Sequence, residues 1–186
     1  DNTIVIYCSD QGFYIGDHGW YAKRWMYEES LMMPFIVNWP GVTKPGLRNQ
    51  HLIQNLDYAE TFLDIAGAKI PGDMQGTSLV PLLRGQTPKN WRTSIYYHYY
   101  EYPSVHMIPR HYGIRTERYK LMHFYQFGNE WELYDLQSDP DELQNLYGKK
   151  GTGKLAADLK KQLRALQKYY QDNSTISEKP KEWQDK

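Results

Sequence analysis

The chain has 186 residues, enough for one compact domain or two small ones with a hydrophobic core. Lysine plus arginine and aspartate plus glutamate each number 22, so no net charge exists to attract nucleic acid or an anionic membrane. The single cysteine, Cys8, excludes an internal disulfide, and no apolar run approaches the roughly 18 residues that cross a bilayer. The 17 tyrosines and 6 tryptophans exceed what a core requires and weakly favour a surface that stacks on sugar rings.

The first predicted element covers residues 3–8, a short and mostly β-branched run. It is too short for a helix and predicts a buried strand of a parallel sheet. Because such a strand needs neighbours on both edges, we expect that sequence upstream of this chain is missing. Residues 34–40 predict a second short strand ended by proline and glycine, with a loop and a short helix between the two strands.

Farther along, residues 56–66 carry apolar side chains at helical spacing and stop at Gly67, which predicts an amphipathic helix covering the sheet. A further short helix is expected just after it, and a leucine stripe near the end of the chain predicts a longer one. Between them, alternating bulky and polar residues predict antiparallel strands. The ranges of these later elements are 77–84 for the short helix, 94–100, 113–118, 119–125 and 131–135 for the strands, and 154–170 for the long helix.

These elements define the fold class as α/β: a fragment of an α/β sandwich, followed by a small antiparallel sheet with a carboxyl-terminal helix. We divide the chain at the change of pattern, with the α/β part over residues 1–88 and the sheet and helix over residues 89–172. Residues 173–186 are polar and lack periodicity, so we expect a flexible tail.

Asp10 and Gln11 directly follow the first predicted strand, where α/β sheets bind their ligands. Adjacent oxygen donors suit a hard cation such as Ca²⁺ better than zinc, which prefers nitrogen and sulfur. Calcium takes six to eight oxygens, so other ligands must come from elsewhere. The alternative is a polar turn that caps the strand and binds nothing.

A glycine-flanked histidine, His18, follows close enough to fold back over a ligand at the strand end, where it could donate a proton or bind an anion. Lys23 and Arg24 come next, immediately before a predicted helix start, and together they could form an anion subsite. The alternatives are a structural loop histidine and a solvated basic pair.

Further short motifs run along the chain, and their order and spacing resemble the formylglycine-dependent sulfatases of the alkaline-phosphatase superfamily. The resemblance covers nearly the whole chain and is closest to sulfatases of amino-sugar or glycosaminoglycan sulfates, such as N-acetylglucosamine-6-sulfatases. The matching segments are residues 2–12, 16–19, 23–30, Pro34, 39–41, 56–57, 63–67, 76–79, 82–85, 114–121, 132–136, Asp139-Pro140 and Glu142.

The resemblance implies roles for individual residues. Asp10 matches the family's metal-binding aspartate, and Gln11 stands where the family has asparagine, histidine or glutamine, so both are implied as Ca²⁺ ligands. Lys23 matches the lysine that contacts the sulfate group and stabilises charge on the transferring oxygens. His18 is assigned only a supporting catalytic or substrate-facing role, because the family's acid and anion-binding histidines usually come from upstream segments.

The sequence departs from the family in one respect. Sulfatases attack sulfur with a hydrated formylglycine made from the first residue of a Cys/Ser-x-Pro-x-Arg motif, and this sequence has no such motif. Cys8 lies inside a predicted strand and is expected to be a buried, small apolar residue. The formylglycine and the remaining metal ligands are therefore expected in the missing amino-terminal half, and the chain by itself is expected to be inactive.

A tyrosine-rich run over residues 96–103 precedes His106, Arg110 and His111. Aromatic faces can stack on pyranose rings and arginine can bind an anion, so we predict that His106, Arg110 and His111 bind a sulfated carbohydrate substrate. The alternative is an aromatic sheet surface packed beneath the final helix.

Two other functions stay open besides a sulfatase acting on carbohydrate sulfate esters. A phosphodiesterase or phosphatase of the same superfamily would need more histidine ligands near Asp10, because those enzymes use two zinc ions. A noncatalytic module could bind sulfated glycan without turnover. The chain itself does not reveal where the protein resides; the resemblance implies a periplasmic or secreted protein.

Overall fold

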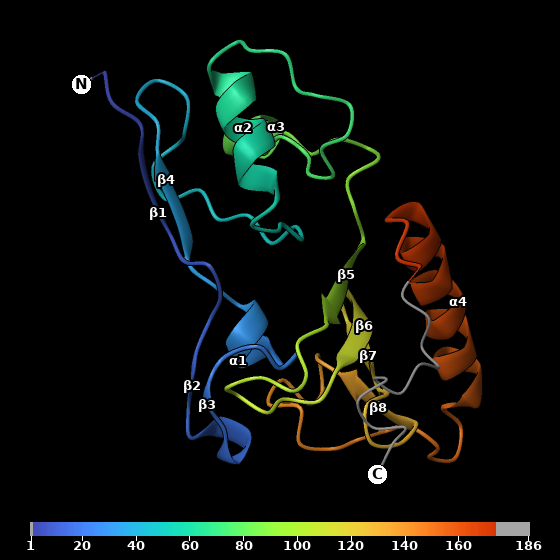
Figure 1. The fold of residues 1–186 in the computed structure, drawn as a ribbon. Helices are drawn as coiled ribbons and strands as arrows, with labels where there is room; N and C mark the ends of the chain where they lie inside the picture. Colours follow the sequence, from blue (N-terminus) through green and yellow to red (C-terminus); the bar gives the residue numbers. More distant parts are fainter. Residues whose placement is uncertain (1, 174–186) are drawn as a thin grey trace. The chain divides into compact units, whose positions relative to one another are not determined.

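The computed structural model describes residues 2–173 and separates the chain into two compact units (Figure 1). Among the described residues, the first unit contains residues 2–12 and 32–93, and the second contains residues 13–31 and 94–173. Residues 13–31, which precede the first unit's second strand in sequence, thus pack with the carboxyl-terminal sheet. Most of the predicted flexible tail, residues 174–186, lies outside the described residues. Within residues 2–173, no helix is both long and apolar enough to span a bilayer.

In the first unit, β1 (Val5–Cys8) pairs with β4 (Phe35–Asn38) and places Tyr7 opposite Ile36. Both strands form where they were predicted. The pairing is antiparallel, however, and Val5 and Tyr7 are 57% and 63% exposed, so the expectation of a buried parallel strand is wrong for the described residues. The physical reason is that β1 and β4 form a sheet of two strands, with no third strand beside β1 within residues 2–173. Cys8, which was expected to be buried, is exposed as well, whereas Phe35 stacks on the helix residue Tyr58 at 5.0 Å.

The first unit also holds α2 (Asp57–Ile65) and α3 (Val80–Leu83). The buried side of α2 is polar, because Asp57, Glu60 and Thr61 accept hydrogen bonds from the backbone N–H groups of Thr77 (2.9 Å), Gly76 (2.5 Å) and Leu79 (2.9 Å). The guanidinium group of Arg92 forms an ion pair with the carboxylate of Asp57, and its Nη2 donates a hydrogen bond to Oδ1 at 2.6 Å. A Cβ atom on Gly76 would lie 2.3 Å from the carbonyl oxygen of Leu56, so only glycine allows this close approach.

The second unit is built on a four-stranded antiparallel sheet in the order β5 (Ser94–Tyr99), β6 (His111–Thr116), β7 (Tyr119–Phe124), β8 (Glu130–Asp135). The long helix α4 (Gly153–Tyr169) covers one face, where its leucines pack on Ile114, Leu121 and Leu133. Just beyond α4, Asp172 accepts a hydrogen bond from the hydroxyl of Tyr96 at 2.5 Å and lies 2.5 Å from Nδ1 of His98. These contacts hold the end of the helix against β5.

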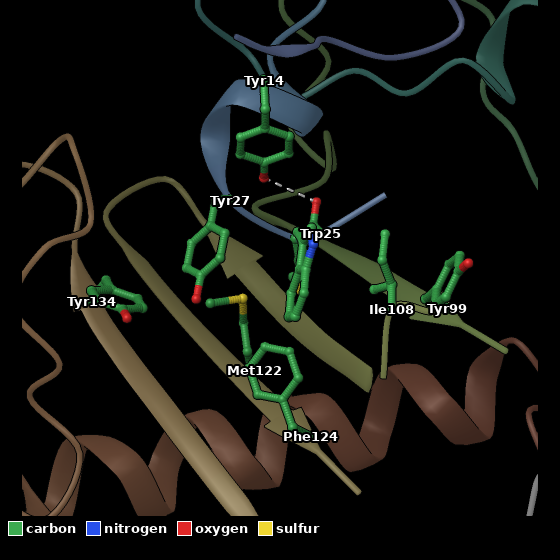
Figure 2. Close-up of a cluster of buried hydrophobic side chains, with 9 residues drawn as sticks. Tyr14, Trp25, Tyr27, Tyr99, Ile108, Met122, Phe124 and Tyr134 are labelled. Carbon is green, nitrogen blue, oxygen red and sulfur yellow. Dashed lines mark hydrogen bonds between the residues drawn. The ribbon is translucent and has the colours of Figure 1, made fainter. Parts of the chain in front are cut away.

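The opposite face of the sheet is covered by residues 13–31, which form β2 (Tyr14–Ile15), a 3-10 turn (Asp17–Gly19), β3 (Tyr21–Ala22) and α1 (Glu28–Leu31). Figure 2 shows Tyr14, Trp25 and Tyr27 of this segment above Met122 and Phe124 of β7, with α4 behind the sheet. Side chains alternate along the strands, so one set contacts α4 and the next contacts this segment. Residues 13–31 approach the sheet closely, because a Cβ atom on Gly113 of β6 would lie 2.6 Å from the sulfur of Met26.

The later elements confirm the predicted pattern. The four strands and the long helix begin and end within two residues of their predicted bounds, and α2 lies inside the predicted range. Side chains of an antiparallel strand point alternately to the two faces of the sheet, and here α4 covers one face and residues 13–31 cover the other. The fold class therefore agrees with the expectation of an α/β fragment followed by a small sheet and a carboxyl-terminal helix.

Candidate functional site

Lys23 lies in the turn between β3 and α1 and is partly buried. Both of its neighbours are non-glycine residues with positive φ angles, 78° for Ala22 and 100° for Arg24. Such conformations are costly for residues with a Cβ and persist only where surrounding contacts enforce them.

Two hydrogen bonds enforce this turn. The backbone N–H of Arg24 donates to Oγ of the buried Ser30 at 3.0 Å, and the hydroxyl of Tyr97 donates to the carbonyl oxygen of Arg24 at 2.5 Å. The next residue, Trp25, is buried in the aromatic core. The backbone beside Lys23 is thus fixed from α1, from β5 and from the core.

His18 lies in the 3-10 turn with a φ angle of 53°. Its ring stacks on Tyr27 with centroids 4.3 Å apart, its Nε2 is 3.5 Å from a carboxylate oxygen of Glu29, and its side chain is only 12% exposed. The ring of His18 is therefore packed on one face by Tyr27, while its Nε2 makes no hydrogen bond within the described residues.

A buried ionic cluster joins α1 to the sheet. Nζ of Lys120, on β7, lies 2.8 Å from Glu28 and 2.7 Å from Glu142, and Arg115 of β6 donates to Glu28 at 2.9 Å. Burial alone would raise the pKa of Glu28, but Lys120 and Arg115 together lower it below its ordinary value. Burial raises the pKa of Glu142 despite Lys120. The cluster anchors the segment that carries Lys23.

The three residues predicted to bind substrate have different surroundings. His106 is exposed in the loop between β5 and β6. Arg110 is partly buried and donates to the carbonyl oxygen of Tyr102 at 2.5 Å, so it closes this loop. His111 is fully buried: its ring stacks among Trp25, Tyr97, Tyr99 and Phe124, and its Nδ1 lies 2.7 Å from the carbonyl oxygen of Pro109.

Burial lowers the pKa of His111 to about 4, which keeps the ring neutral near pH 7. A neutral histidine inside the core is not placed to contact a substrate, so the prediction of substrate binding by His111 is corrected to a core role. The signal in the sequence was ambiguous, because a histidine that begins a strand can face either solvent or core.

Asp10 and Gln11 lie in the turn that follows β1, as predicted, and Asp10 is exposed. Ser9 Oγ donates to the carbonyl oxygen of Gln11 at 2.7 Å, and the side-chain amide of Asn55 donates to the carbonyl oxygen of Asp10 at 3.3 Å. These bonds shape the turn, and the Ser9 hydroxyl also lies 3.4 Å from Oδ1 of the Asp10 side chain. Within residues 2–173, no group of three or more histidine, cysteine, aspartate or glutamate side chains could hold a metal ion.

The structure gives several residues of the second unit roles that the sequence did not predict. Tyr97 and Ser30 fix the turn beside Lys23, and the side chains of Trp20 and Tyr21 form the wall of a cavity together with His106. An aromatic pair directly before a candidate anion-binding lysine is a signal that could have been used. The bonds of Tyr97 and Ser30, in contrast, join residues far apart in the sequence.

Comparison with known proteins defines the class to which this fold belongs. A family model described as N-sulphoglucosamine sulphohydrolase, C-terminal, matches residues 16–169. The chain therefore belongs to this sulfatase family.

Individual relatives narrow the comparison. The chain is 50% identical over 175 residues to an N-acetylglucosamine-6-O-sulfatase of Bacteroides thetaiotaomicron, which covers 93% of this chain and 31% of that protein. It is 34% identical over 155 residues to arylsulfatase K of Homo sapiens, covering 77% of this chain and 27% of the relative. The chain thus spans about a third of the length of these relatives.

Solved structures agree with this relationship. One matches with a TM-score of 0.91 and 48% identity, covers 96% of this chain and 37% of its own, and holds its substrate, D-glucosamine-2-N,6-O-disulfate. A phosphonate monoester hydrolase of Agrobacterium radiobacter matches with a TM-score of 0.78 and 25% identity, covering 90% and 35% of the two chains. The fold is thus shared with enzymes that act on other esters, and identity is higher toward the sulfatase.

Proposed function

We propose that this chain is the carboxyl-terminal part of a sulfatase that hydrolyses sulfate esters of amino sugars or glycosaminoglycans. The observation that carries the proposal is the similarity, over 96% of the chain, to a protein whose structure contains D-glucosamine-2-N,6-O-disulfate. The names of the curated relatives support the same reaction class, sulfuric ester hydrolysis.

Lys23 is proposed as the contact to the sulfate group. A lysine ammonium is a compact cation, and its attraction to the sulfuryl oxygens grows as charge develops on them in the transition state. The fixed backbone on its carboxyl side supports this role, because a preorganised cation needs little rearrangement when substrate binds. His18 is proposed to support this segment from within the 3-10 turn.

Asp10 and Gln11 are proposed as two ligands of a Ca²⁺ ion. Their carboxylate and carboxamide oxygens are the donor types that calcium prefers; Asp10 is exposed and Gln11 is partly buried. When bound, the ion would act as a Lewis acid on the sulfate oxygens. Two donors are too few, so the other ligands would come from the part of the protein that this chain does not contain.

The nucleophile is also proposed to lie outside this chain, since the Cys/Ser-x-Pro-x-Arg motif is absent from its sequence. The role of the second unit would then be to present Lys23 and to bind the sugar, with His106 as the exposed substrate contact and Arg110 shaping its loop. By itself the chain is proposed to be inactive.

A direct experiment replaces Lys23 in the intact protein that contains this chain. We expect Lys23→Ala to lower kcat/KM for sulfate release from 6-sulfo-N-acetylglucosamine by about 100-fold or more, because one charge-stabilising contact contributes about that much. Lys161→Ala, an exposed lysine on α4, should leave the rate unchanged. An unchanged rate in Lys23→Ala would refute the sulfate contact, and binding of sulfated sugar without any turnover would identify a noncatalytic module instead.

Metal removal tests the proposed ion. Treating the intact protein with a chelator should abolish sulfate release, and Ca²⁺ rather than Zn²⁺ should restore it, because the available donors are oxygens. Asp10→Ala should raise the Ca²⁺ concentration needed for half-maximal recovery. Recovery by Zn²⁺ together with hydrolysis of phosphate diesters would favour a phosphodiesterase.

A further inference from the structure

The second unit contains a cavity of about 240 Å³ whose walls come from two segments that are far apart in the sequence. Trp20, Tyr21 and Trp25 come from the segment around β3, and residues 106–109 come from the loop between β5 and β6. Pockets for drug-sized ligands are usually about 300 to 1,000 Å³, so this volume suits one small ring rather than a longer chain.

One wall is a rigid aromatic platform. Trp25 is buried and stacks on the core residue His111 at 5.8 Å, and Trp20 stacks on Trp25 at 4.5 Å. Trp20 is still 42% exposed and Tyr21 is 75% exposed, the latter held edge-on by Phe13 at 5.3 Å. Large exposed aromatic side chains that are anchored in this way can bind a ligand with little loss of conformational entropy.

The opposite wall is held in place at several points. Ile108 is buried in the core of the second unit, and the carbonyl oxygen of Pro109 pairs with the His111 ring at 2.7 Å. The bond from Arg110 to the Tyr102 carbonyl oxygen closes the loop, and the N–H of Met107 donates to Ser104 at 3.1 Å within it. His106 is therefore presented by a tethered loop, as the polar side chain of the cavity wall.

The cavity is also linked to Lys23 along the chain. Tyr21 precedes Lys23 by two residues and Trp25 follows it by two residues, and both line the cavity. The bonds of Ser30 and Tyr97 to Arg24 lie within this same stretch, so the cavity wall and the lysine backbone belong to one fixed turn.

We propose that this cavity is a subsite for one pyranose ring of an amino-sugar sulfate, with the rings of Trp20 and Tyr21 against its apolar face and His106 hydrogen-bonded to a hydroxyl. The inference rests on the proposed function, since Lys23 would bind the sulfate carried by the same sugar. The chemistry is specific: aromatic faces bind the C–H face of a sugar, an imidazole binds hydroxyl groups, and neither requires the sulfate.

The first test measures binding of unsulfated N-acetylglucosamine to the intact protein by saturation-transfer NMR. We expect a signal that Trp20→Ala and Tyr21→Ala each reduce at least about fivefold and that Lys23→Ala retains. Tyr169→Ala is the matched control, because this tyrosine of α4 is 72% exposed and lies outside the cavity wall. Melting curves establish that each variant is folded. No signal in the parent protein, or equal signals in the parent and in both cavity variants, would overturn the subsite.

The second test separates the subsite from the sulfate contact by inhibition of sulfate-ester hydrolysis. Tyr21→Ala should raise the Ki of N-acetylglucosamine about tenfold and leave the Ki of inorganic sulfate unchanged, whereas Lys23→Ala should do the reverse. If the protein hydrolyses no sulfate ester but still binds the sugar at Trp20 and Tyr21, the proposed function fails and the subsite stands. If hydrolysis proceeds and Tyr21→Ala changes neither Ki, the subsite fails and the proposed function stands.

Discussion

At the scale of single residues, His111 shows how burial sets chemistry. The ring is enclosed by aromatic side chains and its pKa is lowered to about 4 from an ordinary value of 6.5. The folded state therefore resists protonation, whereas the unfolded chain accepts a proton below about pH 6.5. The contribution of His111 to the free energy of unfolding is therefore fully present above about pH 6.5 and is lost as the pH falls toward 4.

This shift predicts an acid-sensitive fold. Between pH 7 and pH 5, His111 should lower the free energy of unfolding by about 2 kcal/mol, as the pKa difference requires. Burial also lowers the pKa values of His98 and His123, which add in the same direction. The measurement is urea unfolding at both pH values for the parent and for His111→Phe. His111→Phe should show a smaller pH dependence, and an equal dependence in both proteins would contradict this account.

Some single residues lie where local sequence patterns predict them, and others do not. Asp10 and Gln11 were expected at the end of a strand and lie there, because strand propensity and the following polar turn are local signals. His106 and His111 are only five residues apart and read alike in the sequence, yet one is exposed and the other is buried. Which side of the strand start faces the core is decided by Trp25, which is distant along the chain.

At the scale of elements, α1 is only four residues long and cannot be stable by itself. It is held by Glu28, which pairs with Lys120 and Arg115, and by the backbone N–H of Glu28, which donates to Glu142 at 2.7 Å. The Lys120 side chain is completely buried, so these ionic contacts take the place of the water that would hydrate its ammonium group in the unfolded chain.

Lys120→Met should therefore lower the free energy of unfolding by about 3 kcal/mol, because it leaves Glu142 buried without its cation. Adding Glu142→Gln should recover part of that loss by removing the stranded charge. Lys161→Met on the exposed side of α4 should change stability by less than about 0.5 kcal/mol. Chemical denaturation of the three variants measures these differences, and a Lys120→Met variant as stable as the parent would show that the cluster contributes no net stability.

At the scale of the whole molecule, the bare face of β1 and β4 is the main exposed apolar surface of the first unit's strands. Val5, Tyr7 and Ile36 share this face and are each more than half exposed. Exposed β-branched and aromatic side chains on a two-stranded pair favour association with another surface.

The chain alone is thus expected to self-associate. Tyr7→Lys combined with Ile36→Lys should shift sedimentation toward monomer, because two charges disfavour burial of this face. Val105→Lys, a substitution at a residue that is 95% exposed in the second unit, should leave association unchanged. A parent chain that sediments as a monomer at all concentrations would contradict this expectation.

The sequence by itself determined the elements of the later sheet, the amphipathic helices, the sulfatase resemblance and the positions of Asp10 and Lys23, because periodicity and motif spacing are local properties. Only the tertiary structure decided that β1 pairs antiparallel with β4, that residues 13–31 cover the carboxyl-terminal sheet, and that Trp20, Tyr21 and His106 line one cavity. These features depend on contacts between residues some 30 to 110 positions apart, for which no local pattern exists. The same contacts bury His111 and Lys120. The lowered pKa of His111 and the ion pairs of Lys120 with Glu28 and Glu142 follow from that burial.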